Sequence, residues 1–476
     1  MQSQTIERVL YYFEEISKIP HGSYNIDKIS DYLVSFAKSN QLKYIQDEYK
    51  NVIIYKDATE GYENSPVVVI QGHMDMVAVK RPECSKDMMT EGLELMSDGT
   101  YIYAKDTSLG ADDGIAVAYG LAILESKDIP HPALEVVITT NEEVGMNGAI
   151  GIDPANIKGR LLLNIDSEEE GILTVGCAGG TRVDALIEND GTLQNGEFIK
   201  ISISGLTGGH SGTMIHLGHA NANVLMGRIL DNIRGNMGVN ICSLSGGEKT
   251  NAIATFADSV IKCEDNDKAL KIIKDMAVIL KEEYNVSDED MIIEGSIVSG
   301  EYKAASKHAS DSCINILLDM PDGVISFDKT YRELVDTSLN IGVVKYEDSV
   351  FNYSYEIRSS VRSKMNNLVN RVKNIANLCG AKTVEISSYP EWQVNDNSKL
   401  TGIMSDVYTR MFGKNPRVEV VHAGLECGIL SSKLEGLDAV SFGPDILNIH
   451  TYNEKLDIKS VQRTYDYIKE VLAVLK

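Results

Sequence analysis

An apolar run that ends in two potential metal ligands constrains the fold of this chain more than any other stretch. Residues 67–70 read Val-Val-Val-Ile, which is typical of a buried β-strand. Gln71 and Gly72 follow, and the next side chains include His73 and, two residues on, Asp75. Open α/β sheets bind ligands beyond the carboxyl ends of their strands, so this stretch predicts a site at one edge of such a sheet.

Four further groups of carboxylate or imidazole side chains follow predicted strands or open a predicted helix. They are Asp112 and Asp113 before the helical run 115–124, Glu142 and Glu143 after the strand-like run 134–140, Asp166 after 161–165, and His450 after 439–442 and a short Gly/Pro loop. The resulting order of side chains is His, Asp, Glu, Asp, His. Such oxygen and nitrogen ligands hold pairs of zinc or manganese ions in proteins.

Each of these groups, taken alone, has a simpler interpretation. A single histidine after a strand is usually structural, an aspartate before a helix is usually an N-cap, and acidic pairs often lie in solvated turns. In His-x-Asp, one residue can bind metal while the other supports it. Adjacent glutamates can divide metal binding and proton transfer, and the sequence leaves open which does which. The occurrence of five such ligands together favours the metal site.

Composition and charge exclude several classes of function. The chain has 476 residues, 43% of them hydrophobic, and a formal net charge of −24, which argues against nucleic acid and anionic membranes as partners. No apolar run approaches the roughly 20 residues of a membrane helix. The seven cysteines form no Cys-x-x-Cys pair, so a disulfide framework is not expected. The first residues show no secretory signal, and we expect a cytoplasmic protein.

The pattern of predicted elements divides the chain into a split domain and an insertion. Helix and strand patterns alternate from 112 to 166, which indicates a mostly parallel, helix-covered sheet. Beyond Cys177 the pattern changes to that of an α+β region, in which 314–320 is predicted as a strand. We therefore expect an α/β fold with a mixed, mostly parallel sheet and helices on both faces, formed by 1–180 and 389–476, with an α+β domain inserted at 181–388.

Long motifs spread over essentially the whole chain resemble the M20 metallopeptidase family, and within it the aminoacyl-histidine dipeptidases (Xaa-His dipeptidases of the bacterial carnosinase type). The motifs are Gly-His-Met-Asp-Met-Val at 72–77, Thr-Ser-Leu-Gly-Ala-Asp-Asp-Gly at 107–114, Asn-Glu-Glu-Val-Gly-Met-Asn-Gly-Ala at 141–149, Asn-Ile-Asp-Ser-Glu-Glu-Glu-Gly at 164–171, Gly-Cys-Ala-Gly-Gly at 176–180, Gly-Gly-His-Ser-Gly at 208–212, His-Ala-Gly-Leu-Glu-Cys-Gly at 422–428 and Ile-His-Thr at 449–451.

The resemblance implies a site with two zinc ions, which manganese or cobalt can replace. His73 and Asp166 would hold one ion, Glu143 and His450 the other, and Asp112 would bridge them. Asp75 would orient His73. Glu142 would act as the general base while a hydroxide that bridges the metals attacks the peptide bond. In such enzymes the peptide bond between Asp112 and Asp113 is often cis.

The resemblance also implies that the inserted domain is a lid and dimerisation domain. His210 would stabilise the oxyanion, in relatives often across a homodimer interface, and Arg358 would bind the terminal carboxylate of the substrate. Asn251 would add a hydrogen bond, and Glu426 would hold the amino group. Around Asn251 this chain lacks the arginine, proline and charges that relatives tend to have, and Asp113 stands where some members have asparagine.

The substrate implied is a dipeptide, of the Xaa-His type or another. Two alternatives remain open at this point: an amide hydrolase of the same family that acts on an N-acyl amino acid or a tripeptide, and a metal-binding dimer without activity. The complete ligand set and the presence of Glu142 favour an enzyme.

Overall fold

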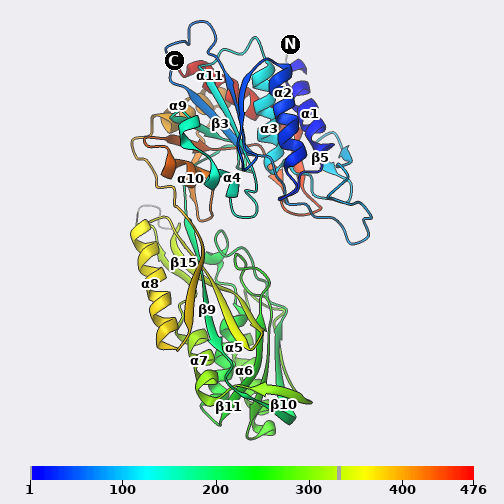
Figure 1. The fold of residues 1–476 in the computed structure, drawn as a ribbon, viewed down its shortest axis with the longest axis vertical. Helices are drawn as coiled ribbons and strands as arrows, with labels where there is room; N and C mark the ends of the chain where they lie inside the picture. Colours follow the sequence, from blue (N-terminus) through cyan, green and yellow to red (C-terminus); the bar gives the residue numbers. More distant parts are fainter. Residues whose placement is uncertain (1–2, 330–333) are drawn as a thin grey trace. The chain divides into compact units, whose positions relative to one another are not determined.

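The computed structural model describes residues 3–329 and 334–476, which form two compact units (Figure 1). Met1 and Gln2, which begin the stretch expected to lack a secretory signal, lie outside the described residues. Unit 1 consists of Met1–Gly176, Trp392–Val420 and Leu425–Lys476, and unit 2 consists of Cys177–Glu391 and Val421–Gly424. Each unit has its own hydrophobic core.

Unit 1 is built on an eight-stranded mixed sheet. In spatial order its strands are β1 (Lys43–Gln46), β2 (Val52–Lys56), β6 (Leu134–Thr139), β3 (Val68–His73), β7 (Leu161–Asn164), β19 (Asp438–Ser441), β8 (Ile172–Cys177) and β18 (Arg417–Val421). The four neighbours β6, β3, β7 and β19 run parallel, while β1–β2, β2–β6 and β19–β8 are antiparallel. The carboxyl ends of β3, β6 and β7 therefore meet at one edge of the sheet.

Helices cover both faces of this sheet, as predicted. The helices are α1 (Ser3–Ser17), α2 (Asp27–Ser39), α3 (Ala111–Glu125), α4 (Asn147–Gly151), α9 (Lys399–Phe412), α10 (Glu426–Lys433) and α11 (Ile458–Val474), with a 3-10 turn η1 (Pro154–Asn156). Side chains alternate along β3, so Val68 and Ile70 lie in the core with α1 and α3, whereas Gln71 contacts Glu426 of α10 on the other face.

A small antiparallel sheet completes unit 1. Its order is β20 (Ile446–Leu447), β21 (Lys455–Asp457), β5 (Tyr101–Ala104) and β4 (Leu95–Ser97). A turn at Asp98-Gly99 joins β4 to β5, and Gly99 has the positive φ of 87° that Asp-Gly hairpin turns favour. The connection between β20 and β21 carries His450.

The described residues of unit 2 form a larger antiparallel sheet and four α-helices. The strands, in order, are β13 (Ile292–Ala304), β10 (Thr192–Ser204), β12 (Ala257–Cys263), β11 (Val239–Gly246), β15 (Val335–Glu347), β16 (Val350–Ser359), β9 (Gly179–Glu188) and β17 (Lys382–Tyr389), and β14 (Gly323–Phe327) pairs with β15. The helices are α5 (Ala222–Arg234), α6 (Asn266–Glu283), α7 (Lys307–Asp319) and α8 (Arg362–Leu378), with a 3-10 turn η2 (Ile215–Leu217). Both sheets agree with the α/β and α+β classes expected.

The prediction of a strand at 314–320 is wrong, because residues 314–319 belong to helix α7 and Met320 is its C-cap. Its buried positions, among them Ala309, Cys313 and Leu317, recur at helical spacing, and the Ser306 side chain caps the helix by accepting from Ala309 N. A short apolar run does not by itself distinguish a strand from one buried stretch of a helix. Across the described part of the chain, none of the helices combines the length and apolar character needed to cross a membrane.

Candidate metal centre

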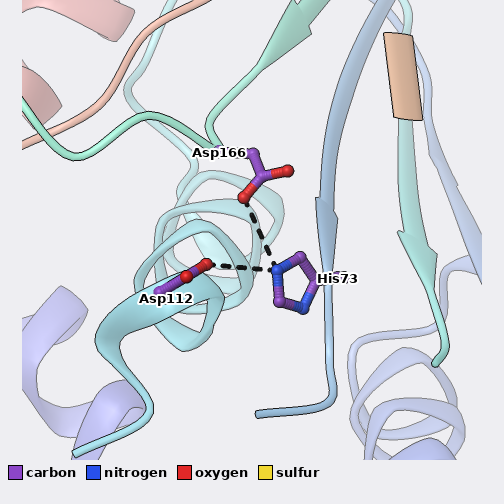
Figure 2. Close-up of side chains that lie close together, drawn as sticks. All are labelled: His73, Asp112 and Asp166. Atoms are coloured by element: carbon purple, nitrogen blue, oxygen red, sulfur yellow. Dashed lines mark hydrogen bonds and ion pairs between the residues drawn. The ribbon is translucent and has the colours of Figure 1, made fainter. Parts of the chain in front are cut away.

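His73, Asp112 and Asp166 form the first group of potential metal ligands in unit 1. Nε2 of His73 lies 3.2 Å from Oδ1 of Asp112 and 3.5 Å from Oδ1 of Asp166. Figure 2 shows both carboxylates turned toward the imidazole, with the two contacts drawn as dashed lines. His73 ends β3, Asp166 follows β7, and Asp112 lies at the start of α3. Parallel pairing of β3 with β7 therefore brings the imidazole and one carboxylate to the same edge, where α3 adds the second carboxylate.

Asp112, Glu143 and His450 form a second group that shares Asp112 with the first. Nε2 of His450 lies 3.1 Å from Oδ2 of Asp112 and 3.0 Å from Oε1 of Glu143. The two oxygens of Asp112 thus face two different imidazoles. Within each group the ligand atoms lie within 4.8 Å of one another. This spacing suits one cation in each group, with Asp112 between the two.

The carboxylates of the two ligand groups favour a positive charge next to them, whether on an imidazole or on a metal ion. Burial disfavours a charged imidazole at His450, but the carboxylates of Asp112 and Glu143 outweigh this effect and raise its pKa to about 11. The same carboxylates attract a metal cation in place of a proton. Imidazole and carboxylate ligands suit zinc, manganese and cobalt, so the donor set fits the two divalent ions that the resemblance implies.

The start of α3 departs from helical geometry where Asp112 lies. Gly110 has φ 67°, Asp112 has φ −84° and ψ 104°, and the peptide bond between Asp112 and Asp113 is cis. Asp113 Oδ2 accepts a hydrogen bond of 3.2 Å from the backbone N of His73. A Cβ at Gly72 would clash with this carboxylate, so glycine at that position allows α3 to approach the end of β3.

Asp75 contacts both His73 and the segment that carries Glu142. Nδ1 of His73 lies 2.9 Å from the main-chain oxygen of Asp75 and 3.6 Å from its carboxylate. The carboxylate accepts hydrogen bonds from Ser23 Oγ at 2.8 Å and from the backbone N of Glu142 at 3.0 Å. The main chain of Asp75 therefore makes the shorter contact with the imidazole, and its side chain fixes the Glu142 backbone.

Glu142 is a partly buried carboxyl beside other acidic groups. Burial raises the pKa of Glu142 well above its usual value, and the charges of Asp166 and Glu143 act in the same direction. A carboxylate that takes up a proton readily is suited to general-base chemistry. Glu143, the next residue, faces His450, so the adjacent glutamates are in different surroundings.

Glu426 lies behind the first ligand group in a buried row of polar side chains. Its Oε2 accepts hydrogen bonds of 2.5 Å from both Gln71 Nε2 and Thr139 Oγ1, and Gln71 Oε1 accepts one of 2.6 Å from Asn164. Within the described residues, Oε1 of Glu426 has no hydrogen-bond partner, and burial raises the pKa of this carboxyl to about 7. Gln71 precedes His73 by two residues, so both face the same side of the sheet.

Two of the remaining predicted site residues meet in unit 2. His210 and Asn251 line a depression of about 360 Å³. Nδ1 of His210 accepts hydrogen bonds from the backbone N of Gly212 at 3.2 Å and of Thr213 at 3.1 Å, which fixes the imidazole ring. The backbone of Asn251 accepts from Ser211 N at 2.9 Å, so the two segments are joined.

Arg358 is buried elsewhere in unit 2, on β16. Its Nη1 donates to Tyr389 Oη at 2.7 Å, its Nη2 lies 3.7 Å from Glu356, and its Nε has no hydrogen-bond partner among the described residues. Burial, and then the Arg358 charge, lowers the pKa of His422, whose Nε2 lies 2.8 Å from Ser338 Oγ. A buried guanidinium with an unused N–H is suited to binding an anionic group.

Several residues of this site were not singled out from the sequence. Gln71 and Thr139 hold Glu426, Ser23 holds Asp75, and Glu454 binds the start of α3. Gln71 carries a usable signal, since it is a polar residue at the end of an apolar strand and two positions before His73. The sequence gives no such signal for Glu454, because its hydrogen-bond partners precede it by more than 340 residues.

Comparisons with known proteins agree with these motifs. A family model described as Peptidase family M20/M25/M40 matches residues 69–473. The chain is 34% identical over 464 residues to the cytosol non-specific dipeptidase of Escherichia coli (strain K12), covering 97% of this chain and 96% of that protein. The crystal structure of aminoacylhistidine dipeptidase from Vibrio alginolyticus matches with a TM-score of 0.83 and 33% identity, covering 98% of this chain and 96% of that one. Aminopeptidase PepT from Bacillus cereus shares the fold, with a TM-score of 0.57, 16% identity and coverage of 99% and 98%.

Proposed function

Since the chain belongs to peptidase family M20/M25/M40, we propose that it is a dipeptidase that uses two metal ions. His73, Asp112 and Asp166 would hold one ion, and Asp112, Glu143 and His450 would hold the other. The observation that carries this proposal is the Asp112 carboxylate, whose two oxygens face two different imidazoles. A single carboxylate placed in this way is suited to bridge two cations.

The residues around this centre divide the chemistry of peptide hydrolysis. Two zinc ions, or manganese or cobalt in their place, would supply Lewis acidity to the scissile carbonyl and to the attacking water. Glu142 accepts the proton from that water on its carboxylate and returns it to the leaving amine. Asp75 holds the Glu142 backbone in place through its bond to the Glu142 N, and its main-chain oxygen fixes the tautomer of His73.

Recognition of a dipeptide requires partners for both of its charged ends. Glu426, whose Oε1 lacks a partner among the described residues, is suited to the amino group, and Arg358 to the terminal carboxylate. His210 supplies positive polarity for the oxyanion, and Asn251, in the same depression, adds a hydrogen bond. The names of the two relatives at 33–34% identity support a dipeptide, of the Xaa-His type among others, and a cytoplasmic location. A homodimer formed through unit 2 stays a prediction.

A substrate panel tests this proposal directly. Purified protein loaded with zinc or manganese is given β-Ala-His, Gly-His, Ala-Leu, Leu-Gly-Gly and an N-acetyl amino acid, and released amine is measured. We expect hydrolysis confined to the dipeptides and strongest with C-terminal histidine. A preference for the tripeptide or the N-acetyl compound would contradict the proposed substrate class. Inactivity toward all five compounds would contradict the proposal that the protein is an enzyme of this kind.

Glu142→Gln tests the general base separately from the metal site. The variant keeps the shape of the side chain but cannot accept the proton, so we expect kcat to fall by about 10²–10⁴-fold. The metal content, measured by atomic emission, should stay at the wild-type value. Glu169→Gln is the matched control, since Glu169 is an exposed carboxyl that pairs with Arg417. Unchanged kcat in Glu142→Gln would contradict the role of Glu142.

A further inference from the structure

Glu454 binds the backbone of the segment that carries Asp112. Its Oε2 accepts hydrogen bonds from the N of Leu109 at 2.7 Å and of Gly110 at 3.0 Å, and its Oε1 accepts from Ala111 N at 2.8 Å and Asp112 N at 3.4 Å. The Glu454 side chain is 3% exposed. One buried carboxylate therefore satisfies four consecutive backbone donors at the start of α3, where N–H groups have no partner within the helix.

The same two segments meet a second time through their side chains. Glu454 ends the loop between β20 and β21, and His450 lies four residues earlier in that loop, with Nε2 3.1 Å from Asp112 Oδ2. The side chain of His450 is 44% exposed and its φ is 60°. Glu454 is thus the buried anchor of a loop whose potential ligand, His450, is partly exposed.

The two ligand groups differ in how they are anchored. His73 ends β3, and Asp166 follows β7, so the parallel pairing of these strands fixes both. His73 is also tied to α3 by the bond from its N to Asp113 Oδ2. His450 lies in the loop between β20 and β21, outside the central sheet. The hydrogen bonds of Glu454 join this loop to the backbone of the segment that carries Asp112.

We propose that Glu454 is a positioning residue that holds the group formed by Asp112, Glu143 and His450 in the arrangement that binds a divalent cation. This inference rests on the proposed two-metal site. Glu454 touches neither ion in this proposal and acts through the backbone of Asp112 and the loop of His450. Carboxylates that orient metal ligands in this way typically change metal affinity by 10–100-fold.

Zinc binding to Glu454→Gln tests the proposal. The amide group of glutamine turns N–H groups toward two of the backbone donors, so the hydrogen bonds from these donors are lost. The volume of the side chain is kept. We expect one zinc ion to bind with wild-type affinity and the other to bind at least 10-fold more weakly, in competition titrations with a chromophoric chelator. Retention of the first ion shows that the variant is folded.

Glu135→Gln is the matched control. Glu135 is another carboxyl with 3% exposure, it accepts hydrogen bonds from the backbone N of Lys158 and Gly159, and it lies on β6 near the end opposite Glu142. It should keep both ions at wild-type affinity even where thermal stability falls. If Glu454→Gln does not fold, Glu454→Asp keeps the charge on a shorter side chain, and a smaller selective loss of the same ion is expected.

Three results would overturn the inference, and they are distinguishable. Two ions bound by Glu454→Gln at wild-type affinity would show that Glu454 only caps α3. Equal weakening of both ions in a folded variant would show that it serves Asp112 alone. Binding of no more than one zinc ion by the wild-type protein would refute the proposed two-metal site itself.

Discussion

The neutrality of His422 is a consequence of its surroundings in unit 2. Burial disfavours the charged imidazole, and the charges of Arg358 and His210 act in the same direction, which lowers the pKa of His422 to about 3. The neutral imidazole of His422 therefore adds no positive charge beside that of the Arg358 guanidinium.

Stability should depend on pH through His422. In the unfolded chain this histidine binds a proton near pH 6.5, whereas in the folded protein it stays neutral until about pH 3. Unfolding therefore takes up a proton between these values, and the free energy of unfolding falls by up to about 1.4 kcal/mol per pH unit as pH decreases. Above pH 6.5 the effect is absent.

Urea unfolding of His422→Asn at pH 7, 6 and 5, followed by circular dichroism, measures this contribution. The variant lacks the titrating group, so the stability advantage of the wild type should shrink by about 1.4 kcal/mol between pH 6 and pH 5. His308→Asn, at an exposed position on α7, should show no such change. A difference between His422→Asn and wild type that is constant with pH would contradict the prediction.

Residue types and strand ends were enough to predict that several of these potential ligands come together at one edge of the sheet. His73 and Asp166 could be found because parallel strands end at one edge of a sheet, and the structure does bring them to Asp112. Glu454 could not be found in this way, because its hydrogen bonds join segments that are distant in sequence. The contact of His73 with the main chain of Asp75 was equally hidden, since a backbone oxygen has no signature in the sequence.

At the scale of elements, the close approach of β3 and α3 sets the positions of two potential ligands, His73 and Asp112. His73 ends the strand, Asp112 begins the helix, and Gly72 lies where the two come together. A Cβ at Gly72 would clash with Asp113 Oδ2 and lie 2.5 Å from the Cβ of Ala116. The spacing between His73 and Asp112 therefore depends on the absence of a side chain at Gly72.

Gly72→Ala should separate the strand from the helix. We expect overpacking to lower the free energy of unfolding by about 1–3 kcal/mol and to weaken zinc binding, because the bond from His73 N to Asp113 is displaced. Gly402→Ala on α9 is the matched control, since nothing lies within 4 Å of its added Cβ. Gly402→Ala should leave the free energy of unfolding unchanged or raise it by about 0.5–1 kcal/mol. Equal stability and zinc affinity in both variants would contradict the expectation.

Of two apolar runs, the longer was predicted correctly and the shorter was not. Residues 115–124 were predicted as helical and belong to α3, but the run at 314–320 was interpreted as a strand. In α7 the deciding features are the cap at Ser306 and the buried positions that precede the run. A window limited to the apolar residues omits both, so the period of the helix is lost.

At the scale of the whole molecule, the separate cores of the two units should make zinc stabilise one unit selectively. All five potential ligands lie in unit 1. A ligand that binds only the folded state stabilises it, by about 2.7 kcal/mol at a free concentration 100 times its dissociation constant. We therefore expect zinc to raise the unfolding temperature of unit 1 and to leave that of unit 2 unchanged.

Trp392 allows this to be measured, because it is the single tryptophan of the chain and lies buried in unit 1. Tryptophan fluorescence reports the unfolding of unit 1, while circular dichroism reports both units, including the long strands of unit 2. Zinc should move the fluorescence transition to higher temperature and split it from the remaining change in dichroism, and a chelator should reverse the shift. In Asp112→Asn, which removes the carboxylate shared by the two ligand groups, the shift should disappear. If both signals move together with zinc in the wild type, the two units unfold as one cooperative body and the separate cores do not give them separate stabilities.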